Sequence, residues 1–317
     1  MAILKKIYPF LLIASLASCE ETIIPDMPHV PVLCVNSLLT ADEPVEVSVS
    51  KSRLYTDSPE KSVVSDAQVS IYANGELQTG SYIPKEGDDV RIVAESPSVG
   101  SGEARVTVPV PIAAPEATWE AYDVEYLRSE GSLYAIQFNL EVNLQIQDPA
   151  GENYYRFSFS TRDPDGGNPD GGRARFELGL LQYDMEPVFN EHIGIFESIM
   201  GGEAEHFSFF SDRQFDGKSY TMRLLFNDCW FTGNNYDCPV YLIVSSVSPS
   251  FYNWANYIWQ YDSGSLVNFG DLGFGDPIWG YSNVSTGAGV VAAQSKSVCS
   301  INLSEFLRQT IADAAKQ

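Results

Sequence analysis

Alternation of apolar and polar residues is the dominant pattern in the first third of the chain. Apolar residues recur at every second position in short runs at 45–50, 67–72 and 105–108, and a period of two predicts half-buried strands. Asn74-Gly75 directly follows one run, and such residues tolerate the positive φ angles of a hairpin turn. The pattern therefore predicts a small Ig-like β-sandwich of about seven strands over residues 32–110.

A proline-rich stretch ends this first region. Pro109, Pro111 and Pro115 fall within 109–115, and proline lacks the N–H group that a central strand must donate. We therefore predict a domain boundary at 109–115.

The alternation resumes after the boundary, at 134–142 and 154–159, and the most apolar run lies at 240–247. A short, continuous apolar run of that length is typical of a central strand. We expect a larger β-rich domain over residues 116–317, so that the whole fold is mainly β, with two antiparallel β-sandwich-like domains.

One or two short helices are expected in this second domain. Ser248 can cap a helix whose first position is Pro249. Apolar residues recur at helical spacing after it and again near the carboxyl end, namely Tyr252, Ala255, Ile258 and Trp259, then Leu303, Phe306, Leu307 and Ile311.

The amino terminus has the parts of a bacterial export signal. Lys5 and Lys6 precede a short apolar stretch at 7–14, which is too short to span a bilayer. The sequence Leu-Ala-Ser-Cys at 16–19 resembles a lipobox, so we expect residues 1–18 to be a lipoprotein signal peptide and Cys19 to carry the lipid. The alternative is an ordinary secretory signal that leaves Cys19 as an exported thiol.

Residues 19–31 are predicted to be a tether. Several acyl chains on one cysteine anchor a protein far more firmly than a single chain does. Three prolines within 22–31 favour an extended segment. Glu20 and Glu21 resemble the surface-export signal of Bacteroidota lipoproteins. The alternative is that these acids only make the tether soluble, in which case the protein could instead be anchored in the periplasmic leaflet.

The charge of the chain excludes one large class of partners. Lysine and arginine number 19 against 42 acidic residues, which gives a net charge of -23, and no basic surface exists to follow nucleic-acid phosphates. Loss of residues 1–18 removes two lysines and no acid, so the mature charge is -23 - 2 = -25. With 44% hydrophobic residues the chain can bury a real core.

Three ordered segments of the second domain carry a resemblance to a known family. They are 148–155 (DPAGENYY), 210–218 (FSDRQFDGK) and 281–289 (YSNVSTGAG). Together with the lipobox and the segments 32–40 and 66–69, they resemble the Bacteroidota lipoproteins of domain-of-unknown-function family four-two-four-nine. One departure is Val290 to Ala293, where family members often have a glycine-phenylalanine pair.

The resemblance implies an outer-membrane lipoprotein, commonly encoded beside a TonB-dependent receptor, and hence an accessory or ligand-capturing partner of that β-barrel transporter. It implies no catalytic residues. A structural or adhesive surface lipoprotein with no transport role is the alternative, because the fold alone does not determine function.

Catalytic motifs are not evident, and we expect no enzyme activity. The only histidines are His29, in the tether, His192 and His206, so a nucleophile would have few candidate bases. No Gly-x-Ser-x-Gly elbow, zinc-protease helix or phosphate loop is present.

One acidic loop has the composition of a calcium site but not its spacing. Asp163, Asp165, Asn168 and Asp170 lie among four glycines, yet Gly167 occupies the fifth position, where an EF-hand has a ligand. We favour a hairpin tip there and expect no cofactor.

Four cysteines remain if Cys19 is lipidated: Cys34, Cys229, Cys238 and Cys299. An even number in an exported chain favours pairing. The loop between Cys229 and Cys238 is rich in glycine and asparagine, so we predict a hairpin closed by a disulfide worth roughly 2 to 3 kcal/mol; two reduced thiols are the alternative. Cys34 could pair with Cys299 only if the first and last strands meet.

Aromatic residues are concentrated between Tyr220 and Tyr281, and core packing is their common use. In the segment 268–280, however, glycines separate Phe269, Phe274 and Trp279, so these rings cannot share one regular element. We predict that they form a partner-binding surface with Trp230 and Phe231 of the disulfide loop.

Overall fold

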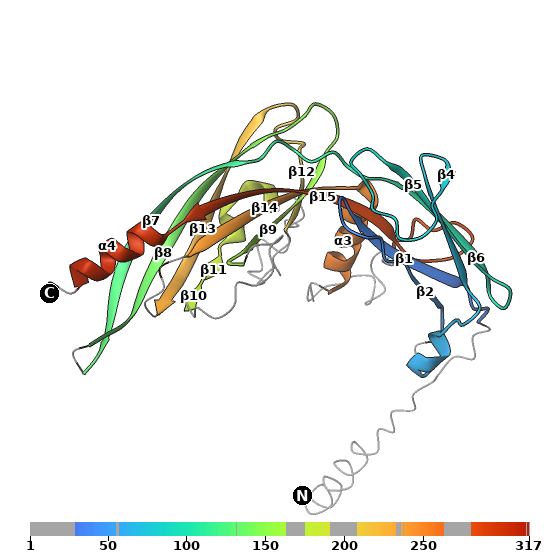
Figure 1. Cartoon of the computed structure of the whole chain (residues 1–317), viewed down its shortest axis with the longest axis horizontal. Coiled ribbons are helices and arrows are strands. Elements are labelled where there is room, and N and C mark those ends of the chain that lie inside the picture. Colours follow the sequence, from blue (N-terminus) through green and yellow to red (C-terminus); the bar gives the residue numbers. More distant parts are fainter. Residues whose placement is uncertain are drawn as a thin grey trace, which may run out of the picture. The chain divides into compact units, whose positions relative to one another are not determined.

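A computed structural model describes residues 29–54, 57–130, 132–162, 175–190, 208–232, 236, 238–262, 280–314 and 316. The chain divides into the segment Met1–Pro31 and the compact unit Val32–Gln317. The compact unit is mainly β, as predicted, and its described part contains three sheets (Figure 1).

A six-stranded sheet brings together segments from the two ends of the chain. Its order is β12 (Phe209–Ser211), β9 (Tyr154–Ser160), β14 (Pro239–Val247), β15 (Val291–Asn302), β1 (Leu33–Thr40) and β2 (Ser48–Lys51). β1 runs parallel to β15, and the other neighbours are antiparallel. The expectation of wholly antiparallel sheets is therefore wrong at this one pair, and the sheet extends across the boundary predicted at 109–115.

A five-stranded sheet faces the first. It has the order β10 (Arg175–Glu177), β13 (Ser219–Thr232), β8 (Ser132–Gln147) and β7 (Glu116–Ser129), and β11 (Leu180–Leu181) also pairs with β13. The alternation of residues in β8 explains why this sheet packs one face against the core. Its residues at even positions from Ile136 to Ile146 are buried, whereas those at odd positions from Gln137 to Gln147 carry amides or a carboxylate.

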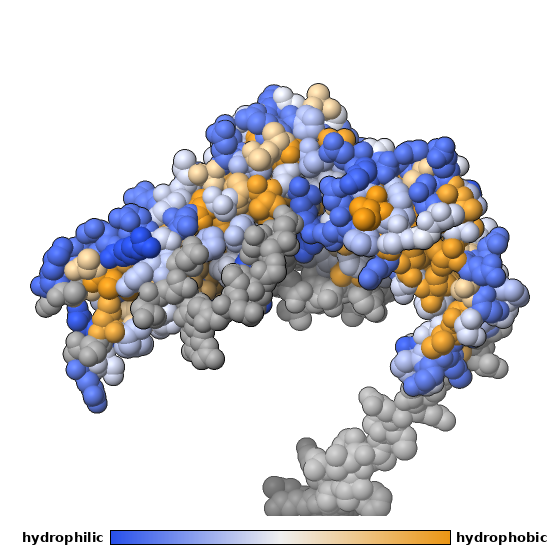
Figure 2. Space-filling model, viewed as in Figure 1, coloured by the Kyte–Doolittle hydropathy of each residue, from blue (hydrophilic) through white to orange (hydrophobic). Residues whose placement is uncertain are grey.

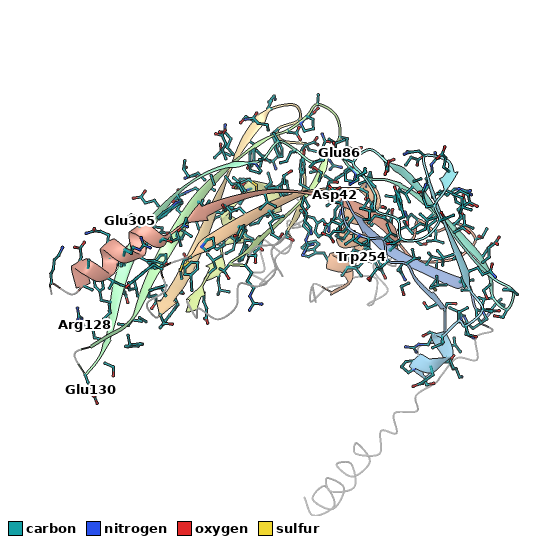
Figure 3. All side chains as sticks on the ribbon, in the orientation of Figure 1. Asp42, Glu86, Arg128, Glu130, Trp254 and Glu305 are labelled. Carbon is teal, nitrogen blue, oxygen red and sulfur yellow. The ribbon has the colours of Figure 1, made fainter. Side chains whose placement is uncertain are left out.

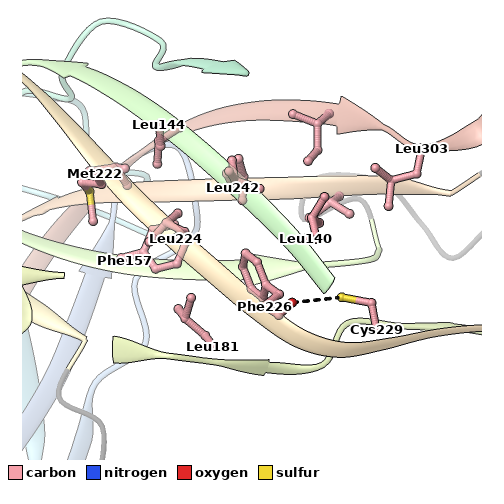
Figure 4. Packing of buried hydrophobic residues seen from close by; sticks show 14 of the residues in the cluster. Leu140, Leu144, Phe157, Leu181, Met222, Leu224, Phe226, Cys229, Leu242 and Leu303 are labelled. Atoms are coloured by element: carbon pink, nitrogen blue, oxygen red, sulfur yellow. Dashed lines mark hydrogen bonds between the residues drawn. The ribbon is translucent and has the colours of Figure 1, made fainter. Parts of the chain in front are cut away.

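The core between these two sheets is a single apolar cluster. Leu140 and Leu144 of β8, Leu224 and Phe226 of β13 and Leu242 of β14 belong to it (Figure 4). Burial of this face determines the register of both sheets, since a slip by one residue would turn every amide of β8 inward.

The four-stranded sheet uses most of the remaining segment before residue 110. Its order is β4 (Glu76–Leu77), β3 (Gln68–Ala73), β5 (Asp89–Ser96) and β6 (Gly100–Thr107). Apolar residues of β5 and β6, such as Ile92 and Val106, pack in one cluster with Val35 of β1 and Ala293 of β15. Residues 32–110 therefore complete their core with a strand from the far end of the chain.

The proline-rich stretch at 109–115 is fastened to β15. The hydroxyl of Ser295 donates to the carbonyl of Pro109 across 2.6 Å, and that of Ser297 donates to the carbonyl of Ile112 across 2.7 Å. The prolines end β6 as predicted, but side chains replace the missing backbone pairing.

Both predicted helices are confirmed: α3 (Pro249–Asp262) and α4 (Ser304–Ala314). Ser248 caps α3, because its Oγ accepts the N–H of Phe251 across 3.3 Å. α3 packs Phe251 and Ala255 on the six-stranded sheet, whereas Trp254 lies on its half-exposed side (Figure 3). α4 places Phe306 against Phe138 and Trp119. Three short 3₁₀ turns complete the described elements: η1 (Pro59–Ser62), η2 (Tyr183–Met185) and η3 (Pro187–Asn190).

The described surface is mostly hydrophilic in the view of Figure 2, in keeping with the excess of acidic residues. None of the described helices has the length and the apolar content that a membrane-spanning helix needs.

Candidate functional site

Three carboxylates from two separate turns converge at one end of the inter-sheet core. Asp148 directly follows β8, Asp212 directly follows β12, and Asp216 lies in the turn before β13. One oxygen of each carboxylate lies within 4.8 Å of those of the other two. Asp148 and Asp212 are buried, and Asp216 is exposed. The group therefore has two buried acids and one that faces solvent.

The turn at 212–218 is built by its own backbone hydrogen bonds. The N–H of Phe215 donates to the carbonyl of Asp212, and the N–H of Lys218 donates to that of Phe215, across 2.7 and 2.8 Å. Gly217 adopts a φ of +67°, which favours glycine. Its N–H donates to Oδ2 of Asp148 across 2.7 Å. The glycine thus lets the second turn supply a donor to the first.

The turn at 148–153 returns similar contacts. The N–H of Gly151 donates to Oδ1 of Asp216 across 2.9 Å. The backbone N–H and the side-chain amide of Asn153 both donate to Oδ2 of Asp212, across 2.8 and 3.0 Å. The hydroxyl of Tyr155 donates to Asp148. Each carboxylate therefore accepts at least one hydrogen bond from the other turn or from β9.

The electrostatics of the group follow from burial and from like charge. Burial raises the pKa of Asp212, and the charges of Asp148 and Asp216 raise it further, whereas the two hydrogen bonds from Asn153 lower it. Burial also raises the pKa of Tyr155, and its hydrogen bond to Asp148 adds to this shift. Tyr155 thus stays a neutral donor at physiological pH.

Three converging carboxylates can supply oxygen ligands to a hard cation such as Ca²⁺. Asp148, Asp212 and Asp216 are the described residues that could hold such an ion. Sequence reasoning selected their two segments for the family resemblance and did not recognise the acids as a group. Each turn combines aspartate with glycine, Asp148 with Gly151 and Asp216 with Gly217, and this composition is the signal that could have suggested it.

The structure does not contain the predicted Cys229–Cys238 disulfide: Cys34, Cys229, Cys238 and Cys299 are all thiols. The predicted hairpin is wrong. β13, which contains Cys229, belongs to the five-stranded sheet, whereas β14, which follows Cys238, belongs to the six-stranded one. The loop crosses between sheets, and both thiols are buried in the core, where Sγ of Cys229 donates to the carbonyl of Phe226 (Figure 4).

The first and last strands do meet, yet Cys34 and Cys299 are far out of register. Cys34 lies opposite Ala288, and Cys299 is 299 - 288 = 11 residues further on, or about 36 Å along an extended strand. A disulfide needs Cα atoms within about 7 Å. This pairing is therefore excluded.

The predicted partner-binding residues separate into core and surface positions. Phe231 is 1% exposed and stacks on Tyr236 with ring centroids 5.7 Å apart, so its prediction as a contact residue is wrong. The neighbouring Trp230 points to the other face of β13, where it is half-buried and pairs with Gln137 and Glu177. Alternation along a strand explains this separation.

Several predicted site residues lie outside the described part of the chain. They are the lipidation site Cys19, the loop residues Asp163, Asp165, Asn168 and Asp170, and the aromatic residues Phe269, Phe274 and Trp279.

No protein-family model matches this chain, and no curated protein and no solved structure gives a match either.

Proposed function

We propose that this protein is an outer-membrane lipoprotein, held by acyl chains on Cys19 and displayed at the cell surface, that captures a ligand or partner for a TonB-dependent transporter. The lipobox at 16–19, followed so closely by the compact unit, is the observation that carries the proposed anchor, and the transport role rests on the family resemblance of the segments 148–155, 210–218 and 281–289. Val32 begins that unit 32 - 19 = 13 residues after Cys19. Such a tether spans at most about 45 Å when fully extended.

The way the chain joins the sheet supports an anchor at this end. The N–H of Val32 donates to Oγ of Ser52, and the N–H of Ser52 donates to the carbonyl of Val32, both across 2.9 Å. β1 then lies between β2 and β15. Tension on the tether would therefore act on a strand that is hydrogen-bonded along both edges.

The chemistry of the cysteine thiols in the described part of the chain favours binding over catalysis. Burial raises the pKa of Cys229 and of Cys299 to about 11, so little thiolate forms at neutral pH. The described part of the compact unit contains no histidine that could serve as a base. A structural or adhesive lipoprotein shares these properties, and the two functions differ in whether a transporter partner exists.

Lipid attachment is tested in cells fed labelled palmitate. We expect the label on the wild-type chain and its loss in Cys19→Ala. Cys34→Ala is the matched control, because it removes a nearby cysteine that lies inside β1. Label that survives in Cys19→Ala, or disappears in Cys34→Ala alone, would contradict the proposed anchor.

The partner is tested by affinity purification of the full lipidated chain from outer membranes in mild detergent. We expect recovery of a β-barrel receptor, identified by mass spectrometry. Recovery of no β-barrel receptor while palmitate labelling is intact would reject the transport role and leave the structural or adhesive one.

A further inference from the structure

A row of side chains crosses the six-stranded sheet on the face opposite the inter-sheet core. Phe209 of β12 lies opposite Arg156 of β9, Arg156 lies opposite Ser245 of β14, and Ser245 lies opposite Lys296 of β15. Directly paired residues share a face. The neighbours Tyr155 and Val244 belong to the core, so the row points away from it.

The two cations of this row differ in their partners. Lys296 forms an ion pair with Glu43 across 2.6 Å. Arg156 forms no ion pair with any described carboxylate. By comparison, Arg91, Arg105 and Arg223 each contact an acidic side chain. In a chain with 42 acidic residues, Arg156 is thus a half-buried cation without a counter-ion from the described part of its own fold.

The guanidinium of Arg156 is oriented by an aromatic ring. Its central carbon lies 5.7 Å from the ring centroid of Phe209, and Phe209 is itself held edge-on by Phe251 of α3 at 5.0 Å. Burial raises the pKa of Tyr183, whereas the positive charge of Arg156 lowers it. Such a guanidinium is less mobile than one on an open surface.

One donor of this oriented group has no acceptor. Nε of Arg156 is buried and makes no hydrogen bond, and a buried donor without an acceptor is unfavourable. Ser245, which is 3% exposed, is the small residue between Arg156 and Lys296. Strands are spaced by about 4.8 Å, so the backbones of the two cations are about 10 Å apart, and their long side chains can reach one anion between them.

We propose that Arg156, supported by Phe209 and assisted by Lys296, binds an oxyanion group, a carboxylate or a phosphate, of a ligand from outside the chain. Guanidinium binds both groups through paired N–H donors. The site deepens the proposed capture function by naming the chemistry of what is captured, and it does not depend on lipid attachment or on a transporter.

Arginine modification by phenylglyoxal, measured peptide by peptide with mass spectrometry on the full folded chain, tests the proposal. We expect sodium phosphate or sodium acetate to slow modification of Arg156 saturably, by about ten-fold or more, relative to chloride at the same ionic strength. Arg162, an exposed arginine just beyond the end of β9, is the internal control and should react at an unchanged rate. Equal protection of both arginines, or no protection of Arg156 by either anion, would overturn the site.

The two anions distinguish the source of the chemistry: protection by acetate alone indicates a carboxylate ligand, and protection by phosphate alone a phosphorylated one. In a parallel measurement, the anion should raise the melting temperature of the wild type and of Arg162→Gln but not of Arg156→Gln. If Arg156→Gln does not fold, Arg156→Lys keeps the charge without the planar donors and should weaken the anion effect by about ten-fold. An unchanged response in a folded Arg156 variant would refute the proposal, whatever the palmitate and receptor experiments show.

Discussion

Gly289 lies against the backbone of Val35 so closely that no side chain fits between them. A methyl group on Gly289 would lie 2.2 Å from the carbonyl oxygen of Val35. This contact occurs where the chain enters β15 beside β1, and it belongs to the segment 281–289 that carries part of the family resemblance. The glycine therefore allows the parallel pairing that joins the two ends of the compact unit.

Gly289→Ala should lower the free energy of unfolding by roughly 3 kcal/mol or more, because it combines a positive φ of +114° with a clash against backbone. Gly100→Ala is the matched control: Gly100 has a φ of +128° with no atom within 4 Å of the added methyl. It should lose only about 1 kcal/mol. Denaturant titration of both variants measures the difference, and equal losses would show that the close approach to Val35 is unimportant.

Local patterns predicted the elements of the fold well. Alternation in β8 and the Ser248-Pro249 cap of α3 are set by neighbours in sequence, so they can be read without a structure. The pairing of Leu38 with Ala292 could not be predicted, because a parallel contact between distant segments leaves no local period. The same limit explains the incorrect hairpin at 229–238: a turn-rich loop does not reveal that its two strands belong to different sheets.

The candidate carboxylate site was missed for a similar reason. Asp148 and Asp212 are 212 - 148 = 64 residues apart, and the pairings of β12 with β9 and of β13 with β8 bring their turns together. Each acid alone is an ordinary turn residue. In the acidic loop at 163–170, by contrast, the acids lie close together in sequence, so composition alone suggests a cation site there.

Asp212→Asn should stabilise the fold at neutral pH. The pKa of Asp212 is raised in the fold, so its ionisation is harder when folded than when unfolded. Its contribution to stability is therefore fully present below about pH 3.8, the pKa of an unperturbed aspartate, and is lost as pH rises through the higher folded value. Asparagine stays neutral and can still accept from Asn153. When free energies of unfolding are measured between pH 3 and pH 7, the value for Asp212→Asn relative to that for the wild type should increase as pH rises.

Asp89→Asn provides the comparison of opposite sign. Arg105 lowers the pKa of Asp89, so the wild-type carboxylate stabilises the fold above its unfolded pKa and loses that effect as pH falls. At neutral pH, Asp89→Asn should therefore have a lower free energy of unfolding than the wild type. The difference should be small because the ion pair is exposed. If Asp212→Asn and Asp89→Asn changed stability with pH in the same direction, the raised pKa of Asp212, assigned to burial and to the charges of Asp148 and Asp216, would be wrong.

The four thiols should be detectable directly. Alkylation after unfolding without reductant should modify Cys34, Cys229, Cys238 and Cys299, because all four are thiols in the structure. In the folded chain Cys229 should react slowly, since burial raises its pKa to about 11. The melting temperature should be the same with and without reductant. If Cys229 and Cys238 both resist alkylation after unfolding and the melting temperature falls on reduction, the two residues form the disulfide after all.

Phe231→Ala and Trp230→Ala form an adjacent pair on opposite faces of β13. Phe231 is in the inter-sheet core and stacks on Tyr236, so its truncation should cost about 3 to 5 kcal/mol of unfolding free energy, as other large-to-small core changes do. Trp230 is half-buried beside Gln137 and Glu177 and leaves no closed cavity when truncated, so its loss should be clearly smaller. Denaturant unfolding followed by far-UV circular dichroism measures both without relying on the tryptophan signal.

If Trp230→Ala is fully folded yet fails to recover a receptor that the wild type recovers, Trp230 remains a partner-contact residue. An equal or larger loss of stability in Trp230→Ala would mean that this face of the sheet is also covered.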